Sequence, residues 1–171
     1  MKNLIYLILI AFAFTSCQQQ KIGYVDNSIL INEIQEKKDL ETKFQGKQEA
    51  FKKKTDSISQ AFQLEVQQTQ LTAQKSSQKK AQELMGGLQQ KQQLLQQQIQ
   101  FEEQQLNQLA QSEIDSLIIK VKDFVKSYGK TNGYTYILGT SDGAASVLYG
   151  TDENNLTQTI LEALNAEYNN E

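Results

Sequence analysis

Proline, histidine, arginine and tryptophan are all absent from this 171-residue chain. Without histidine, the chain lacks the commonest general base and the commonest nitrogen ligand of metals. Without arginine, it lacks the side chain that binds phosphate and carboxylate groups through paired hydrogen bonds. A nucleic-acid-binding protein would also need a basic stripe, usually with arginine. The sequence therefore predicts a non-enzymatic protein with no cofactor, no metal site and no nucleic-acid partner.

Aromatic residues make up only 8% of the chain, so a large globular core along its whole length is not expected. Glutamine is abundant instead, and most of it lies between Gln60 and Gln111. Since proline is missing and apolar residues recur periodically, this composition favours long polar helices over disorder. The net charge of −3 is unevenly distributed, because no basic residue follows Gly139.

Residues 1–16 resemble a bacterial lipoprotein signal peptide. A lysine at position 2 precedes an apolar run from Leu4 to Phe14, which is too short to span a membrane. The only cysteine, Cys17, follows, with Phe14 where such signals usually carry leucine. The resemblance implies lipidation of Cys17, a lipidated linker over residues 17–21, and a periplasmic location on a Gram-negative membrane, preferably the outer one. The alternative is an ordinary secretory signal with a chance cysteine near its cleavage site.

Two separated parts of the mature chain are predicted to form one small β body, residues 22–27 and 129–171. Ile22–Asp26 reads as a strand that ends in helix-capping residues. Tyr134–Leu138 and Ser146–Tyr149 read as two further strands, separated by turn residues. A capping box at Asn155–Gln158 is expected to open a final helix.

Residues 28–128 are predicted to form a long antiparallel helical hairpin. Apolar residues recur there at steps of three, four and seven, with the most regular run from Ile114 to Tyr128, as in a coiled-coil seam. Two positions for the tip remain open. Residues 72–78 contain the midpoint of the segment, whereas Gly86-Gly87 is the only helix-breaking pair. The predicted fold class is thus α+β, a helical hairpin on a small β body.

The order of these elements resembles the OmpH/Skp family of periplasmic chaperones. Weak signals carry the resemblance, among them Ile22–Asp26, the segment Val121–Lys126 before Gly133-Tyr134, and Val147–Tyr149. The resemblance implies a homotrimer whose strands form a β-barrel body. Three hairpins would project from it as tentacles around a cavity that holds unfolded outer-membrane proteins without ATP.

The resemblance assigns roles to two sets of residues. The expected trimer body comprises Ile22, Tyr24, Val25, Tyr134, Tyr136, Ile137, Val147 and Tyr149. The expected client-facing residues are Phe44, Phe51, Phe62, Leu95 and Phe101. Well-known members are soluble and basic, whereas this chain is acidic and carries an expected anchor. Lys52-Lys53-Lys54 is therefore interpreted either as a lipopolysaccharide contact or as a solvated helix face.

The sequence also leaves open a second function and a possible modification. The protein could be a structural or adaptor coiled-coil lipoprotein, in which the apolar seam is fully used within the hairpin and no client surface is left. Asp56-Ser57-Ile58 and Asp115-Ser116-Leu117 also match a short bacterial O-glycosylation pattern, which makes Ser57 and Ser116 candidates for modification.

Overall fold

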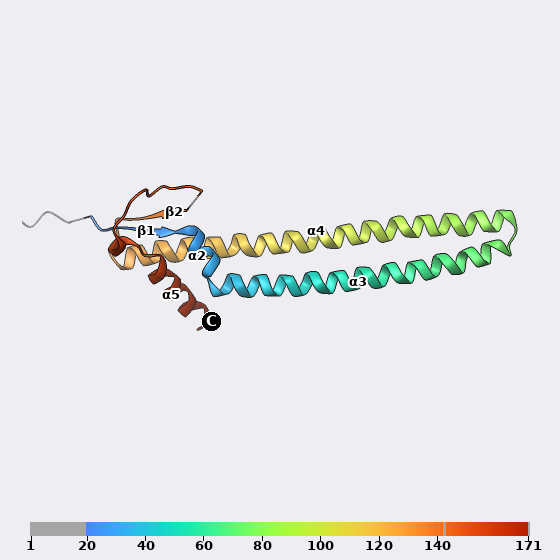
Figure 1. The fold of residues 1–171 in the computed structure, drawn as a ribbon, viewed down its shortest axis with the longest axis horizontal. Helices are drawn as coiled ribbons and strands as arrows, with labels where there is room; N and C mark the ends of the chain where they lie inside the picture. The colour runs from blue at the N-terminus through green and yellow to red at the C-terminus, as the bar shows by residue number, and fades with distance from the viewer. Residues whose placement is uncertain (1–19, 142, 171) are drawn as a thin grey trace, which may run out of the picture. The chain divides into compact units, whose positions relative to one another are not determined.

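The computed structural model describes residues 20–141 and 143–170 of the chain. The elements, in chain order, are β1 (Ile22–Asp26), α2 (Asn27–Glu33), α3 (Gln35–Gln74), α4 (Gln78–Thr131), β2 (Tyr136–Thr140), the short 3-10 helix η1 (Asp152–Asn154) and α5 (Thr157–Tyr168) (Figure 1). Among these described residues, no helix is both long and apolar enough to cross a membrane.

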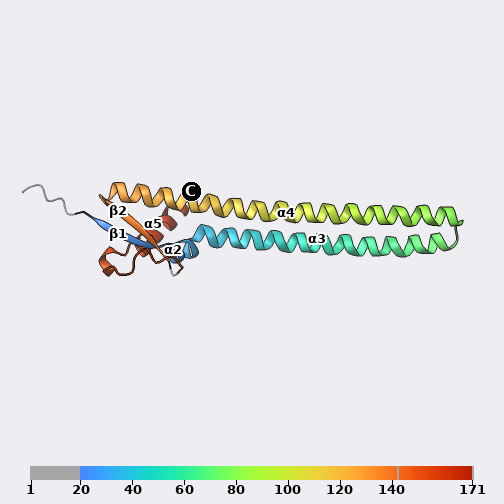
Figure 2. The same cartoon turned by 90° about the horizontal axis from the view of Figure 1, so that it is seen from above.

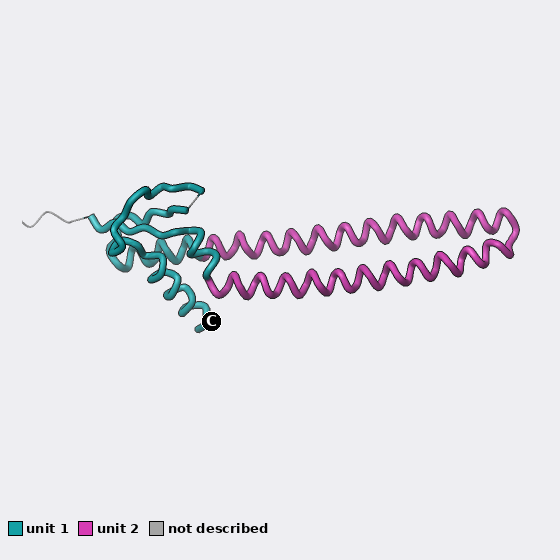
Figure 3. The backbone as a smooth tube through the Cα atoms, viewed as in Figure 1, with its two compact units in different colours: residues 1–33, 121–171 teal, residues 34–120 magenta. Residues whose placement is uncertain are grey.

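The chain divides into two compact units, coloured separately in Figure 3. The first unit combines residues 1–33 with residues 121–171 and is called the body below. The second unit is residues 34–120 and is called the hairpin. Helix α4 contributes residues to both units.

The body is built around a two-stranded parallel sheet in which Ile22 pairs with Tyr136 and Asp26 with Thr140. The other edge of β1 is also occupied. The backbone N–H of Leu156 donates to the carbonyl of Tyr24 at 2.8 Å. Among the described residues, by contrast, no strand pairs with the outer edge of β2. The sheet therefore presents one open edge, along β2.

The body core lies where α2 and α5 pack together. Leu30 of α2 is 1% exposed and Ile160 of α5 is 0% exposed. Leu156 and Tyr134 pack closely on β1 at Gly23, where a Cβ atom would meet the side chains of both. Burial of these aliphatic side chains is the main stabilising contribution in the body.

The two helix starts of the body differ in how well they match the sequence patterns. At α2, the carboxylate of Asp26 accepts the N–H groups of Ser28 and Ile29, at 2.9 and 3.0 Å, so the predicted cap is confirmed. At α5, the expected capping box was wrong. Gln158 donates along its own helix to Glu162, while the carbonyl of the Asn155 side chain accepts the N–H of Thr157 at 3.0 Å. An Asx turn thus replaces the capping box.

The predicted strand over Ser146–Tyr149 was also wrong, because this segment forms no strand in the structure. Leu148 and Tyr149 are 91% and 86% exposed. A strand requires backbone hydrogen bonds to a neighbouring edge, and this segment does not pair with the open edge of β2. The alternating pattern of its residues is therefore not enough to make it a strand in the single chain.

The strand β2 begins two residues later than predicted, because Tyr134 lies in the turn that follows α4. Its N–H donates to the carbonyl of Gly129 at 2.9 Å, after Gly133 adopts a φ of 71°. The Tyr134 ring stacks on Tyr128 at 6.2 Å, and the ammonium of Lys21 lies 4.0 Å from its centroid.

The hairpin consists of α3 and the part of α4 up to residue 120, which lie side by side in both views (Figures 1 and 2). The chain reverses at residues 75–77, within the first of the two predicted tips. There the hydroxyl of Ser76 donates to the carbonyl of Thr72 at 2.8 Å. Gly86-Gly87 remains helical within α4. The break at Ile34, where ψ is 131° and α2 is separated from α3, was not predicted.

Candidate functional surfaces

Four ion pairs connect α3 to α4 across the hairpin. Glu36 pairs with Lys120 at 3.1 Å, Lys43 with Glu113 at 3.1 Å, Lys54 with Glu102 at 2.6 Å, and Glu65 with Lys91. The residue numbers of the two partners add up to the same value in every pair. The pairs therefore share one antiparallel register, from the base of the hairpin to two thirds of its length. We call this side of the hairpin the ion-pair edge.

The Lys54–Glu102 pair shows how these contacts act on a carboxylate. The hydrogen bond from Lys54, followed by that from Gln98, holds the pKa of Glu102 below its usual range. All four pairs are at least partly exposed to solvent. Each pair therefore adds little stability, and the main effect of the set is to favour one register over a slipped one.

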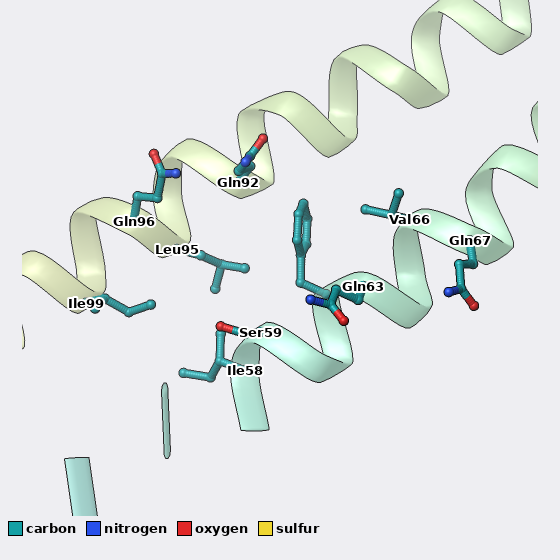
Figure 4. Close-up of a pocket in the computed structure, with 10 residues that line it drawn as sticks. Ile58, Ser59, Gln63, Val66, Gln67, Gln92, Leu95, Gln96 and Ile99 are labelled. Atoms are coloured by element: carbon teal, nitrogen blue, oxygen red, sulfur yellow. The ribbon is translucent and has the colours of Figure 1, made fainter. Parts of the chain in front are cut away.

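The opposite side of the seam contains a groove with a volume of about 530 Å³ (Figure 4). Its apolar lining is Ile58, Phe62, Val66, Leu95 and Ile99. Its polar lining is Ser59, Gln63, Gln67, Gln92 and Gln96. A second groove of about 670 Å³ shares Phe62 and Val66 and extends to Met85 and Leu88. Together we call them the seam groove. None of the residues that line it is charged.

The five predicted client-facing residues occupy three different environments. Phe44 is buried in the hairpin, with 8% exposed. Phe51, Phe62 and Leu95 are half-buried. Only Phe101 is open to solvent, with 60% exposed.

Other large apolar side chains of the hairpin are exposed and were missed in the sequence. They are Leu64, Leu71, Met85, Leu94, Leu109 and Ile119. The missed signal was a second heptad spacing off the seam. Leu64 and Leu71 are seven residues apart, as are Leu94 and Phe101.

The residues predicted for the trimer body also divide by exposure. Ile22 is 42% and Tyr136 58% exposed, and Tyr149 is almost fully exposed. Tyr24, Tyr134, Ile137 and Val147 are half-buried, and Val25 is buried within its own chain. Two exposed leucines, Leu138 and Leu148, were not predicted. A small cavity of about 140 Å³ lies among Ile22, Tyr24, Leu138, Val147 and Tyr149.

The remaining sequence candidates are placed as follows. Cys17 lies outside the described residues. Within the lysine run, Lys54 pairs with Glu102, and Lys52 and Lys53 are exposed. Ser57 and Ser116 are both exposed on helices, and the hydroxyl of Ser116 donates to the carbonyl of Ser112 at 2.8 Å. The described part of the chain contains no group of three or more residues suited to a metal ion.

Comparison with known proteins identifies the family. The family model for OmpH-like outer membrane proteins matches residues 21–164. The chain belongs to this OmpH-like family. The family expected from the sequence is thereby confirmed, over nearly the whole described chain.

A solved structure agrees with this assignment at the level of the fold. It is a candidate OmpH-like outer membrane chaperone from Caulobacter crescentus CB15. The two chains superpose with a TM-score of 0.74 at 11% identity, over 86% of this chain and 85% of the other. None of the curated proteins matches the chain. The two proteins thus share one fold at very low sequence identity.

Proposed function

We propose that this OmpH-like protein is an ATP-independent periplasmic holdase chaperone for unfolded outer-membrane proteins. The observation that carries the proposal is the apolar surface along the hairpin, where Leu64, Leu94 and Phe101 are each about 60% exposed on two glutamine-rich helices. Such a surface offers many weak contacts and no single shaped pocket. It suits a client that has no fixed conformation.

The active form is a homotrimer in this proposal. The open edge of β2 and the exposed segment with Leu148 and Tyr149 provide backbone and apolar groups that a second protomer would cover. Strand addition between protomers would give residues 146–149 the strand pairing that they lack in the single chain. Clients would then be held in the cavity between three hairpins, with Phe101 and its exposed neighbours as the contacting residues.

A lipid anchor at Cys17 would hold the trimer at a periplasmic membrane surface, with the outer membrane as the preferred site. Two or more acyl chains anchor a protein far more firmly than one. Replacement of Cys17→Ser should move the protein from the membrane pellet to the soluble periplasmic fraction. Retention in a salt-washed pellet would contradict the anchor.

Light scattering of a denatured outer-membrane β-barrel, diluted into buffer, tests the holdase directly. A soluble form that lacks residues 1–17 should suppress aggregation at one trimer per client. The variant Leu94→Gln/Phe101→Gln should suppress it several-fold less, because two exposed apolar side chains are removed. The matched control is Gln97→Ala/Gln104→Ala, which changes two exposed residues with the same spacing on the same helix. This control should act like the unchanged protein.

The second candidate function is a structural coiled-coil lipoprotein, and the ion-pair edge favours it. Four pairs in one register are what a spacer of fixed length would need. Absence of any suppression by the unchanged protein would reject the holdase in favour of this spacer.

A further inference from the structure

The two edges of the hairpin differ in chemistry. Glu65 lies on the ion-pair edge, where it pairs with Lys91. Gln63 is two residues away and so points about 200° around the helix, toward the seam groove. On α4, Gln92 and Gln96 border the same groove. The hairpin thus has a charged edge and an amide edge, and the seam groove opens on the amide edge (Figure 4).

The apolar residues of the groove have a regular spacing. Ile58, Phe62 and Val66 are four residues apart, which places them about 6 Å apart along the axis of α3. Along an extended strand, side chains on one face recur about every 6.7 Å. The two periods match closely. Three side chains on one face of a strand could therefore contact Ile58, Phe62 and Val66 in turn.

The polar lining of the groove complements a peptide backbone. Each glutamine carboxamide carries both N–H donors and a carbonyl acceptor, the same pair of groups as a peptide bond. The lining residues are uncharged. A neutral peptide backbone could therefore enter the groove without displacing water from a charged side chain. A charged peptide face would find no opposite charge there.

We propose that the seam groove binds an extended polypeptide segment with apolar side chains at every second position. Between Met85 and Ile99 the groove runs about 21 Å along α4. This length accommodates about six residues of a strand, hence three apolar side chains. Strands of membrane β-barrels have this alternating pattern. The inference rests on the proposed function and names the element of the client that one hairpin recognises.

Site-directed photo-crosslinking on the soluble trimer tests where such a segment binds. The probe is a ten-residue peptide with leucine or tyrosine at alternate positions and serine or threonine between them. Gln96→p-benzoylphenylalanine places the crosslinker on the amide edge. Gln98→p-benzoylphenylalanine is the matched control, because Gln98 is also exposed but hydrogen-bonded to Glu102 on the ion-pair edge. Both crosslinkers are placed in the Leu94→Gln/Phe101→Gln variant, because Gln98 lies one helical turn from each of those apolar side chains. Crosslinking should be at least fivefold stronger from position 96. Equal yields would overturn the proposal.

Binding measurements with charge variants add an independent readout. Gln63→Glu/Gln96→Glu should weaken binding of the alternating peptide at least tenfold, because charges then line the groove. Gln60→Glu/Gln97→Glu adds the same charge at exposed positions outside the groove and should bind normally. A peptide of the same composition, with apolar residues at three- and four-residue steps, should bind at least tenfold more weakly. Equal affinity of the two double variants, or of the two peptides, would contradict the proposal.

The light-scattering assay distinguishes failure of the groove proposal from failure of the holdase proposal. If the unchanged protein suppresses aggregation and the alternating peptide shows no preference for the groove, the groove proposal fails and the holdase stands. If the unchanged protein suppresses nothing, the holdase itself fails.

Discussion

The body and the hairpin are stabilised in different ways. In the body, Leu30 and Ile160 are almost completely shielded from solvent. In the hairpin, Leu88 is the only buried residue between positions 45 and 116, all of which the structure describes. A conventional core thus specifies the body. The hairpin depends on helix propensity, a thin apolar seam and ion pairs that fix its register.

This difference has a functional consequence. Apolar burial contributes roughly 25 cal/mol per Å², so a thin seam offers little to offset the entropy of ordering the two helices. The distal hairpin should therefore open locally at low free energy, while the body unfolds only globally. A chaperone arm that must fit clients of different sizes needs such compliance, whereas a platform for assembly needs the opposite.

Truncation of one core residue in each unit should show the largest contrast. Ile160→Ala should lower the free energy of unfolding of the body by about 2–5 kcal/mol, since Ile160 is fully buried. Phe62→Ala should cost about 1 kcal/mol, because Phe62 is half-buried and already borders a groove. Urea denaturation followed by circular dichroism measures both. Equal losses would mean that the seam is packed like a core.

A charge on the open sheet edge should affect assembly more than folding. Tyr136 is 58% exposed in the single chain. If a second protomer covers it, Tyr136→Asp should bury an unpaired charge and weaken the trimer by several kcal/mol. Sedimentation equilibrium at micromolar concentration should then show a monomer. A Tyr136→Asp protein that remains trimeric would place the interface elsewhere.

Sequence patterns predicted most of the elements whose signals are local. The hairpin, its tip near Ser76 and the cap at Asp26 follow from periodicity and short-range hydrogen bonding. Sequence patterns failed where the structure of a segment depends on residues far away in the chain. Residues 146–149 carry a strand pattern, but a strand requires an edge from elsewhere. The break at Ile34 has no local signal, because no glycine or proline marks it.

The candidate surfaces were less predictable than the fold. Phe44 fits the seam so well that it is buried, whereas Phe101 lies off the seam and is exposed. Both are aromatic residues of an amphipathic helix, and the signal that distinguishes them is the heptad spacing from Leu94 to Phe101, which lies off the seam. The seam groove likewise depends on how far apart the two helices lie, which a periodic sequence does not specify.

Substitution of the glycine pair should stiffen the hairpin. Neither Gly86 nor Gly87 has any atom within 4 Å of where a Cβ would lie. Gly86→Ala/Gly87→Ala should therefore stabilise α4 by about 1 kcal/mol per site, through helix propensity alone. Hydrogen exchange over residues 80–95 should slow accordingly. In the body, Gly23→Ala is the control and should destabilise, because Leu156 occupies the space. Unchanged exchange near residue 87 would show that this part of α4 does not open.

Acidification should have the smallest effect. The pKa of Glu102 is lowered in the folded hairpin, so its contribution to stability is present above the unfolded pKa and is lost as the pH falls through the folded pKa. As the pH falls below the ordinary glutamate pKa of 4.5, the protection of amides around Lys54, corrected for the intrinsic pH dependence of exchange, should therefore decrease slightly. Glu102→Gln should abolish this pH dependence. If the Glu102→Gln variant showed a pH dependence of the same size, another titratable group would be its cause.

Hydrogen exchange of the soluble form that lacks residues 1–17, with and without an unfolded outer-membrane β-barrel, tests the central claim most directly. Without client, amides of residues 58–99 should exchange quickly and those of residues 156–164 slowly. Addition of client should slow exchange over residues 58–99 and leave residues 156–164 unchanged. Slow exchange along the whole hairpin, with no response to client, would contradict a compliant client-binding arm and indicate a rigid spacer.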